Sequence, residues 1–204
     1  MELVGWLNPA SVLDVGTGFG KYGVLCREYL DVNKANRFGE RNHRIDGIEA
    51  YREYLTPLHA YVYDEVYVGD ALKIIPTLDR EYGLILLIDV LEHLSFEGGT
   101  ELLDRCKSRG RNMIISTPLD IGHQGGVFGN EYETHRAQWT KNRLKSLGDV
   151  LFLPNKYSVI CFTGADIGRV SRCYNRESRG IKPFVALHFP TATRAYHRVR
   201  RGSA

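Results

Sequence analysis

The stretch Ser11-Val-Leu-Asp-Val-Gly-Thr-Gly-Phe-Gly20 decides the fold of this 204-residue chain. Its first half is a short β-rich run, and glycines follow at positions 16, 18 and 20. Glycines at every second position let a strand turn sharply into a helix, and they bring the backbone close to a ligand because no Cβ intervenes. The next segment, from Lys21 to Leu30, has apolar residues at helical spacing. The stretch therefore predicts a strand, a glycine loop and a helix.

The same alternation of apolar runs and helix-like segments continues along the chain, and it predicts an α/β fold. We expect a Rossmann-like three-layer sandwich around a mostly parallel seven-stranded sheet with an antiparallel edge strand. The polar stretch 31–43 is interpreted as a surface insertion. The further strands are expected at 44–48, 65–68, 82–88, 112–116, 150–153 and 157–162. The further helices are expected at 51–60, broken or kinked near Pro57, and at 71–78, 97–106 and 140–147.

Composition and charge suggest a globular domain with a basic end. Apolar residues make up 43% of the chain and charged residues 25%, which excludes a disordered or fibrous protein. The net charge of +3 hides an asymmetry, because residues 165–204 carry +7 and the rest carries −4. We therefore predict a ligand-binding globular domain over 1–164 and a basic C-terminal extension over 165–204. The charge asymmetry bears on the partners of the chain and not on its fold.

The cysteines and the N-terminus bear on location. The four cysteines, at 26, 106, 161 and 173, form no C-x-x-C pair and match no zinc spacing, so we expect free thiols and no metal site. No apolar run approaches the ~20 residues that span a bilayer, and no signal peptide is evident. A cytoplasmic location is the expectation.

Four successive predicted strands end in Gly or acidic residues, and this is the most informative feature of the sequence. They end at Asp14 and Gly16, at Glu49, at Asp70 and at Asp89. Ligands of open α/β sheets bind beyond the carboxyl ends of the strands. We therefore expect these residues to surround one ligand.

The residue types at these ends indicate what that ligand is. The glycine loop does not fit the dinucleotide fingerprint G-x-G-x-x-G, because Lys21 stands where the third glycine would be. It does not fit the P-loop either, because no Gly-Lys-Ser/Thr follows. Asp14 would repel a pyrophosphate and attract a cationic amine. Glu49 can accept hydrogen bonds from ribose hydroxyls, and Asp70 can accept one from the exocyclic amine of adenine. S-adenosylmethionine has these groups and no diphosphate.

These segments resemble those of class I S-adenosylmethionine-dependent methyltransferases. The resemblance rests on Asp14-Val-Gly-Thr-Gly-Phe-Gly20, Ile48-Glu-Ala50, Val68-Gly-Asp-Ala-Leu72 and Asp89-Val-Leu-Glu-His-Leu94, and it covers about residues 11–163. The last segment looks like that of the small-molecule branch with the ubiquinone- and menaquinone-type methyltransferases. One departure is that Glu49 follows Gly20 by 29 residues, where about 20 are usual.

The resemblance implies a role for each matching residue. Gly16, Thr17, Gly18 and Gly20 would line the methionine part of S-adenosylmethionine, and Asp14 would approach its amino group. Glu49 would hold the ribose, with Ala50 and Tyr51 beside the adenine. Asp70 and Ala71 would bind the adenine edge, and Asp89 and Val90 would lie near the sulfonium. S-adenosylhomocysteine would be the product.

The acceptor side is less defined. Methyl transfer needs a general base only if the nucleophile must lose a proton. His93 and His135 are the candidate catalytic residues, and each is also open to a structural interpretation. A small-molecule acceptor is the main hypothesis. The interleaved arginines and aromatics of 165–204 leave open an RNA or protein acceptor, packing on a second subunit in a homodimer, or a non-catalytic partner subunit.

Overall fold

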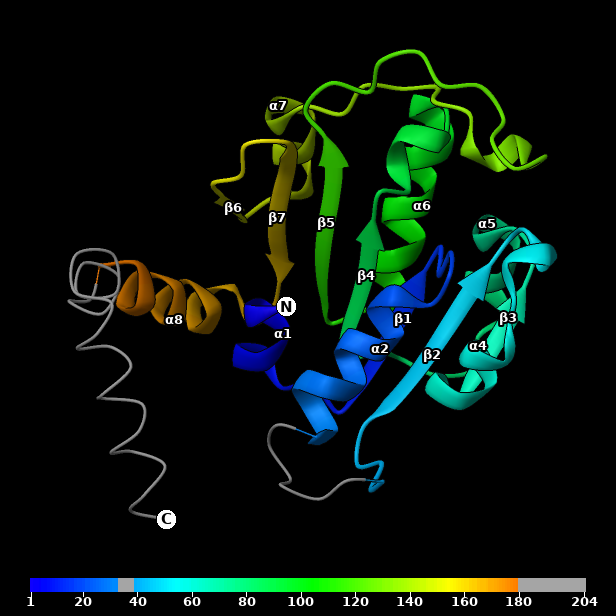
Figure 1. Ribbon diagram of the computed structural model, residues 1–204. Coiled ribbons are helices and arrows are strands. Elements are labelled where there is room, and N and C mark those ends of the chain that lie inside the picture. The colour runs from blue at the N-terminus through cyan, green and yellow to red at the C-terminus, as the bar shows by residue number, and fades with distance from the viewer. Residues whose placement is uncertain (33–38, 180–204) are drawn as a thin grey trace, which may run out of the picture. The chain divides into compact units, whose positions relative to one another are not determined.

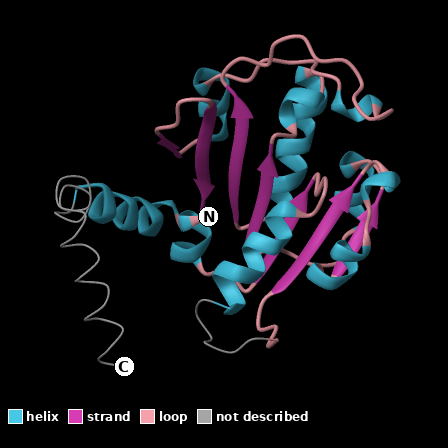
Figure 2. Ribbon diagram, viewed as in Figure 1, coloured by secondary structure: helices cyan, strands magenta, loops and turns pink. Residues whose placement is uncertain are grey.

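The computed structural model describes residues 1–32 and 39–179, and its strands form a single twisted sheet (Figures 1 and 2). The strand order is β3-β2-β1-β4-β5-β7-β6. β1 to β5 run parallel, and β7 pairs antiparallel with both β5 and β6. The seven strands are β1 (Ser11–Val15), β2 (Arg44–Glu49), β3 (Glu65–Val68), β4 (Leu84–Ile88), β5 (Asn112–Pro118), β6 (Val150–Leu153) and β7 (Ser158–Gly164). The predicted α/β fold is confirmed.

Helices pack on both faces of the sheet. Leu13 and Val15 of β1 point into an apolar core with Leu102 and Trp139, whereas Asp14 faces the opposite side, where Tyr63 contacts it. The side chains of a strand alternate between faces, which accounts for this division. The α-helices are α1 (Glu2–Leu7), α2 (Lys21–Arg27), α4 (Pro57–Val62), α5 (Ala71–Ile74), α6 (Phe96–Arg109), α7 (Lys141–Leu144) and α8 (Ile167–Arg179).

Short helices of other types complete the described elements. They are η1 (Glu28–Val32), η2 (Arg52–Tyr54), η3 (Ile75–Thr77), η4 (Leu91–His93), η5 (Glu131–Glu133) and η6 (Lys145–Leu147). The helix predicted over 51–60, broken or kinked near Pro57, consists of two separate helices, η2 and α4. Pro57 begins α4 instead of kinking a longer helix, and the His59 ring accepts a 3.1 Å hydrogen bond from Thr56 N. Proline suits the first helical position because its missing N–H has no partner there in any case.

Contacts divide the chain after Ile167 into two units. The predicted boundary at 164 remains a prediction. The second unit begins within α8, and its residues 180–204 lie outside the described part of the chain, as do 33–38 of the predicted insertion. None of the helices in the described residues is long and apolar enough to cross a membrane.

Candidate functional site at the carboxyl ends of the strands

The strand order places the four predicted ligand-binding segments next to one another. β3, β2, β1 and β4 are consecutive in the sheet, so the segments that follow them meet at its carboxyl edge. Together they line a cavity of about 360 Å³. This volume lies within the range of small-molecule sites. Ten of the predicted site residues line it: Gly16, Thr17, Gly18, Glu49, Ala50, Asp70, Ala71, Asp89, Val90 and His93.

The glycine loop forms the floor of this cavity. Gly16, Gly18 and Gly20 have φ values of +75°, +51° and +85°, in the left-handed region that favours glycine. A Cβ on Gly16 would lie 2.8 Å from Cγ2 of Val90, so a larger residue at position 16 would force the loops after β1 and β4 to shift. A Cβ on Gly18 would meet nothing within 4 Å, which leaves its backbone open to a ligand.

Glu49 joins the end of β2 to this loop. Its Oε2 accepts hydrogen bonds from Gly18 N at 2.8 Å and from the Thr17 hydroxyl at 3.3 Å, and its Oε1 accepts one from Tyr51 N at 2.8 Å. Burial raises the pKa of Glu49, and these hydrogen bonds partly offset the rise. A carboxylate has about four acceptor positions, so roughly one is left for a ligand.

Asp70 and Asp89 hold the turns after β3 and β4. Asp70 Oδ1 accepts from Leu72 N at 2.9 Å and caps α5, which leaves Oδ2 for a ligand. Asp89 has a φ of +55°, a conformation that Asp tolerates better than most residues. Its Oδ1 accepts a 3.2 Å hydrogen bond from the Ser116 hydroxyl. Burial raises the pKa of Asp89, while Ser116 and Lys21 act in the opposite direction.

Four predicted site residues do not line the cavity: Asp14, Gly20, Tyr51 and His135. Asp14 lies beneath the glycine loop, 1% exposed, where the Tyr63 hydroxyl donates to its Oδ2 at 2.6 Å. Gly20 caps the start of α2. Tyr51 lies at the rim, with its ring 5.1 Å from that of Tyr54. From this buried position Asp14 could act on the amino group of the predicted cofactor only indirectly.

The two candidate histidines lie side by side, but only one faces the cavity. The rings of His93 and His135 are 5.2 Å apart, and His135 Nδ1 contacts Ile121 O. Burial lowers the pKa of His93, which favours its neutral form, and the nearby Glu133 carboxylate acts against this. A neutral imidazole beside a cavity can accept a proton. His135 does not line the cavity, and its ring instead contacts the backbone of Ile121.

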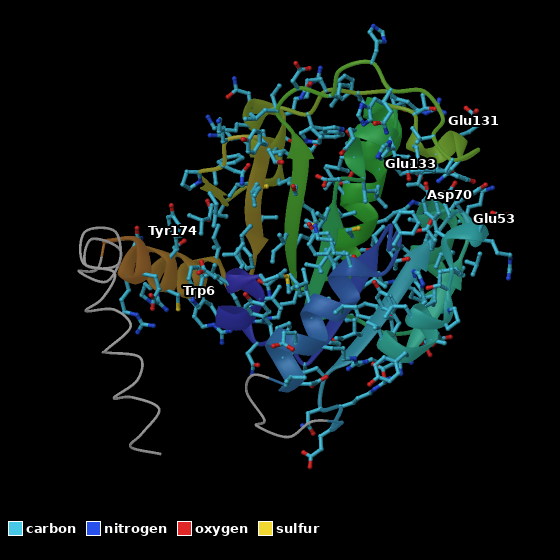
Figure 3. All side chains as sticks on the ribbon, in the orientation of Figure 1. Trp6, Glu53, Asp70, Glu131, Glu133 and Tyr174 are labelled. Atoms are coloured by element: carbon cyan, nitrogen blue, oxygen red, sulfur yellow. The ribbon has the colours of Figure 1, made fainter. Side chains whose placement is uncertain are left out.

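The sequence pattern did not predict several of the residues that line the cavity. Phe19, Lys21 and Tyr22 belong to the glycine loop and the start of α2, and they are adjacent to residues that were predicted. Tyr54, Asn130, Tyr132 and Glu133 come from regions with no strand-end signal. The last three lie on the segment 119–138, here called the strap, which arches from β5 over the carboxyl edge (Figure 1). Figure 3 labels Glu133 and Asp70 at this end of the molecule.

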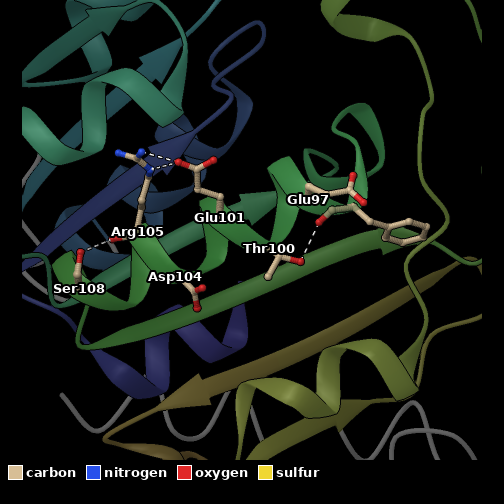
Figure 4. A pocket seen from close by; sticks show the side chains of 7 residues that line it. Glu97, Thr100, Glu101, Asp104, Arg105 and Ser108 are labelled. Carbon is tan, nitrogen blue, oxygen red and sulfur yellow. Dashed lines mark hydrogen bonds and ion pairs between the residues drawn. The ribbon is translucent and has the colours of Figure 1, made fainter.

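A second, shallow hollow lies on the outer face of α6 and carries no comparable chemistry (Figure 4). Arg105 pairs with Glu101, and the Thr100 and Ser108 hydroxyls donate to helix carbonyls at 2.7 and 2.8 Å. These four side chains are thus occupied within the helix. Within residues 1–32 and 39–179, His, Cys, Asp and Glu side chains form no group of three or more that could hold a metal ion.

Comparison with known proteins identifies the fold. No family model matches the sequence, and no curated protein does. Solved structures do match. The N-terminal domain of EvdMO1, determined with SAH and D-fucose, is 11% identical with a TM-score of 0.59, over 79% of this chain and 78% of that chain. The chain has a methyltransferase fold.

Two further structures agree. A SAM-dependent methyltransferase from Archaeoglobus fulgidus is 17% identical with a TM-score of 0.53, over 75% of this chain and 86% of that one. The O-methyltransferase NcsB1 from neocarzinostatin biosynthesis, in complex with SAH and 1,4-dihydroxy-2-naphthoic acid, is 16% identical with a TM-score of 0.52, over 78% of this chain. The match spans 51% of NcsB1. At these identities the likeness establishes the shared fold.

Proposed function

We propose that the chain is an S-adenosylmethionine-dependent methyltransferase that acts on a small or medium-sized acceptor and releases S-adenosylhomocysteine. One observation carries the proposal: Gly16, Glu49, Asp70 and Asp89, from four consecutive strands, line one cavity. Structures with this fold that were determined with SAH support the choice of cofactor. Membership of the ubiquinone- and menaquinone-type branch stays a prediction.

The cavity fits the cofactor on three counts. The open backbone at Gly18 provides a cradle for the methionine part. The remaining acceptor position of Glu49 suits a ribose hydroxyl, and the free Oδ2 of Asp70 suits the adenine amine. Carboxylates at the transfer end favour a sulfonium over a diphosphate. Asp14 would act through the glycine loop.

The cofactor, when bound, supplies an activated methyl group to the acceptor. This chain's residues position the two reactants and exclude water, which can provide much of the acceleration. His93, whose pKa burial lowers, would take a proton from an acceptor that must lose one. His135 is a positioning residue in this account, because it lies behind His93.

A nucleic-acid acceptor is the second candidate, and the helix α8 favours it. Arg169, Arg172 and Arg176 are exposed on α8 and are spaced by three and four residues, which places them along one face. RNA binding that falls steeply with salt and disappears when residues 168–204 are removed would support this candidate. Binding unchanged by the truncation would count against it.

The proposal is tested by incubating the protein with methyl-labelled S-adenosylmethionine and a fractionated cell extract. Transfer of label to a small-molecule fraction is the expected result. An Asp70→Asn variant serves as the matched control, because asparagine retains the helix cap but presents an amide N–H₂ to the adenine amine. Transfer to RNA would favour the second candidate, and cofactor binding without any transfer would favour a non-catalytic subunit.

A further inference from the structure

Glu133 is a cavity carboxylate that none of the cofactor contacts uses. It lies on the strap, and its Oε1 accepts a 2.9 Å hydrogen bond from the Tyr54 hydroxyl. The side chain is partly buried and lines the cavity. Among the described residues, no Lys or Arg lies within ion-pair distance of it. Its charge therefore faces the cavity with one hydrogen-bond donor and no counter-ion.

The rest of the cavity does not supply that counter-ion. Among the described residues that line it, Lys21 is the one side chain with a permanent positive charge, and Lys21 lies close enough to Asp89 to lower the pKa of that carboxyl. In the proposed function, Glu49 and Asp70 bind the nucleoside of the cofactor. Glu133 is left without a role. A half-buried carboxylate with no counter-ion attracts a cation.

Aromatic side chains surround the opening beside Glu133. Phe19 is 61% exposed, Tyr132 54% and Phe128 75%, and each comes from a segment at the carboxyl edge. The Phe19 ring packs 4.8 Å from Tyr54 and 6.4 Å from Phe128. Large exposed aromatic surfaces that adjoin a cavity mark ligand sites, and their faces attract both rings and ammonium groups.

From this placement we infer that Glu133 recognises the acceptor, and that the acceptor is an arylalkylamine, whose ring packs on the aromatic rim and whose ammonium pairs with Glu133. The inference rests on the proposed function and names its substrate class. Acceptors with a carboxylate or phosphate near the reacting atom are disfavoured, because Glu133 and Asp89 would repel them.

The corresponding reaction is an N-methylation. The ammonium loses its proton to the neutral imidazole of His93. The freed lone pair of nitrogen then attacks the methyl carbon, and the carbon–sulfur bond breaks with its electron pair moving to sulfur. The products are the N-methylated ammonium ion, S-adenosylhomocysteine and protonated His93, which returns its proton to solvent. Charge and atoms balance without a further reactant.

Three probes with the same ring separate the acceptor classes: phenethylamine, 2-phenylethanol and 3-phenylpropionate. Their binding to the full chain saturated with S-adenosylhomocysteine is measured by calorimetry. We expect phenethylamine to bind at least about tenfold more tightly than 3-phenylpropionate, with the alcohol between them. Glu133→Gln should remove most of that preference, whereas Glu131→Gln should not, because Glu131 is exposed and does not line the cavity.

The outcomes distinguish this inference from the proposed function. Failure of the wild-type protein to bind S-adenosylhomocysteine overturns both. Binding of S-adenosylhomocysteine together with equal or tighter binding of the acid overturns the inference alone. An unchanged amine preference in Glu133→Gln also overturns it. The relative binding of the amine, the alcohol and the acid to the wild-type protein tests the inference even if the Glu133→Gln variant unfolds.

Discussion

The Tyr63 hydroxyl donates a 2.6 Å hydrogen bond to Asp14, and this pair is buried directly beneath the glycine loop. Tyr63 also accepts from Gly23 N at 3.2 Å, so it ties the loop's strand to α2. Burial raises the pKa of Asp14 to about 7, the Tyr63 hydrogen bond counters part of the rise, and Glu49 adds to it. Between about pH 4 and pH 7 the folded protein therefore holds a proton on Asp14 that the unfolded chain has released.

Asp14→Asn should make the protein more stable at alkaline pH. A carboxyl whose pKa is raised on folding stabilises the folded state least above that raised pKa, so stability falls between pH ~4 and ~7. Asparagine does not ionise, so it removes this loss of stability, and its side-chain oxygen still accepts the hydrogen bond from the Tyr63 hydroxyl. We expect a gain in unfolding free energy at pH 8 of at most about 4 kcal/mol, and a far smaller effect at pH 4. Urea unfolding of both proteins at the two pH values measures it.

The exposed Asp104 of α6 provides the control for this comparison. Asp104→Asn should leave the difference between pH 4 and pH 8 unchanged. A loss of stability at pH 8 in Asp14→Asn would show that Asp14 is ionised and paired in the folded state, contrary to this account.

Asp31 should behave in the opposite way. It is 2% exposed and accepts from His43 Nδ1 at 2.7 Å and from Arg27 Nη1 at 2.9 Å. Burial alone would raise the pKa of Asp31, but these hydrogen bonds outweigh it and the net pKa is lowered. Its stabilisation is present above the unfolded pKa and is lost as pH falls. Asp31→Asn should cost about 3 kcal/mol at pH 7 and progressively less toward pH 3. Thermal unfolding across this range checks the trend, and a constant cost would contradict it.

Gly16→Ala should destabilise the protein more than Gly122→Ala. Both glycines have positive φ, at +75° and +55°, and each substitution carries a backbone penalty of about 1 kcal/mol. Only at position 16 would the new Cβ also collide with Val90, at 2.8 Å. Denaturant unfolding should show an excess cost of about 1–3 kcal/mol for Gly16→Ala. Equal costs for the two variants would mean that the loops after β1 and β4 do not touch.

Asp70→Asn and Asp70→Ala separate binding from stability. Asparagine keeps the cap on Leu72 N, whereas alanine loses it at a cost of about 1 kcal/mol. Both should weaken S-adenosylmethionine binding about tenfold, because each removes the acceptor for the adenine amine. Titration calorimetry and thermal unfolding of the pair measure the two effects. Full affinity in Asp70→Asn would remove Asp70 from the site.

The parts of the site that could be predicted from sequence are those set by local pattern. Each β-rich run ends in a turn residue, and parallel strands bring such ends to one edge, so Glu49, Asp70 and Asp89 could be grouped before the structure was known. Pro57 indicates a break in the helix predicted over 51–60, but the sequence pattern does not show that the two parts are separate helices with Thr56 as the N-cap of the second. The six-residue helix α1 has too few turns to show a period.

The strap could not be predicted in the same way. Its residues 119–138 have no apolar period, and tertiary contacts set its path: the Gln124 side chain donates to Glu133 O at 2.8 Å, and Arg136 N donates to Glu92 O at 2.7 Å. Glu133 therefore reaches the cavity through contacts with residues distant in sequence. The inward or outward direction of Asp14 depended likewise on the strand register, which sequence pattern left open.

Calorimetric titration with S-adenosylmethionine and S-adenosylhomocysteine, with NAD as the control, tests the central claim most directly. The account predicts micromolar binding of the first two and no binding of NAD, because the glycine loop, Glu49 and Asp70 fit a nucleoside without a diphosphate. Absence of binding by both, or tighter binding of NAD, would contradict the assignment of the cavity as a methyl-donor site.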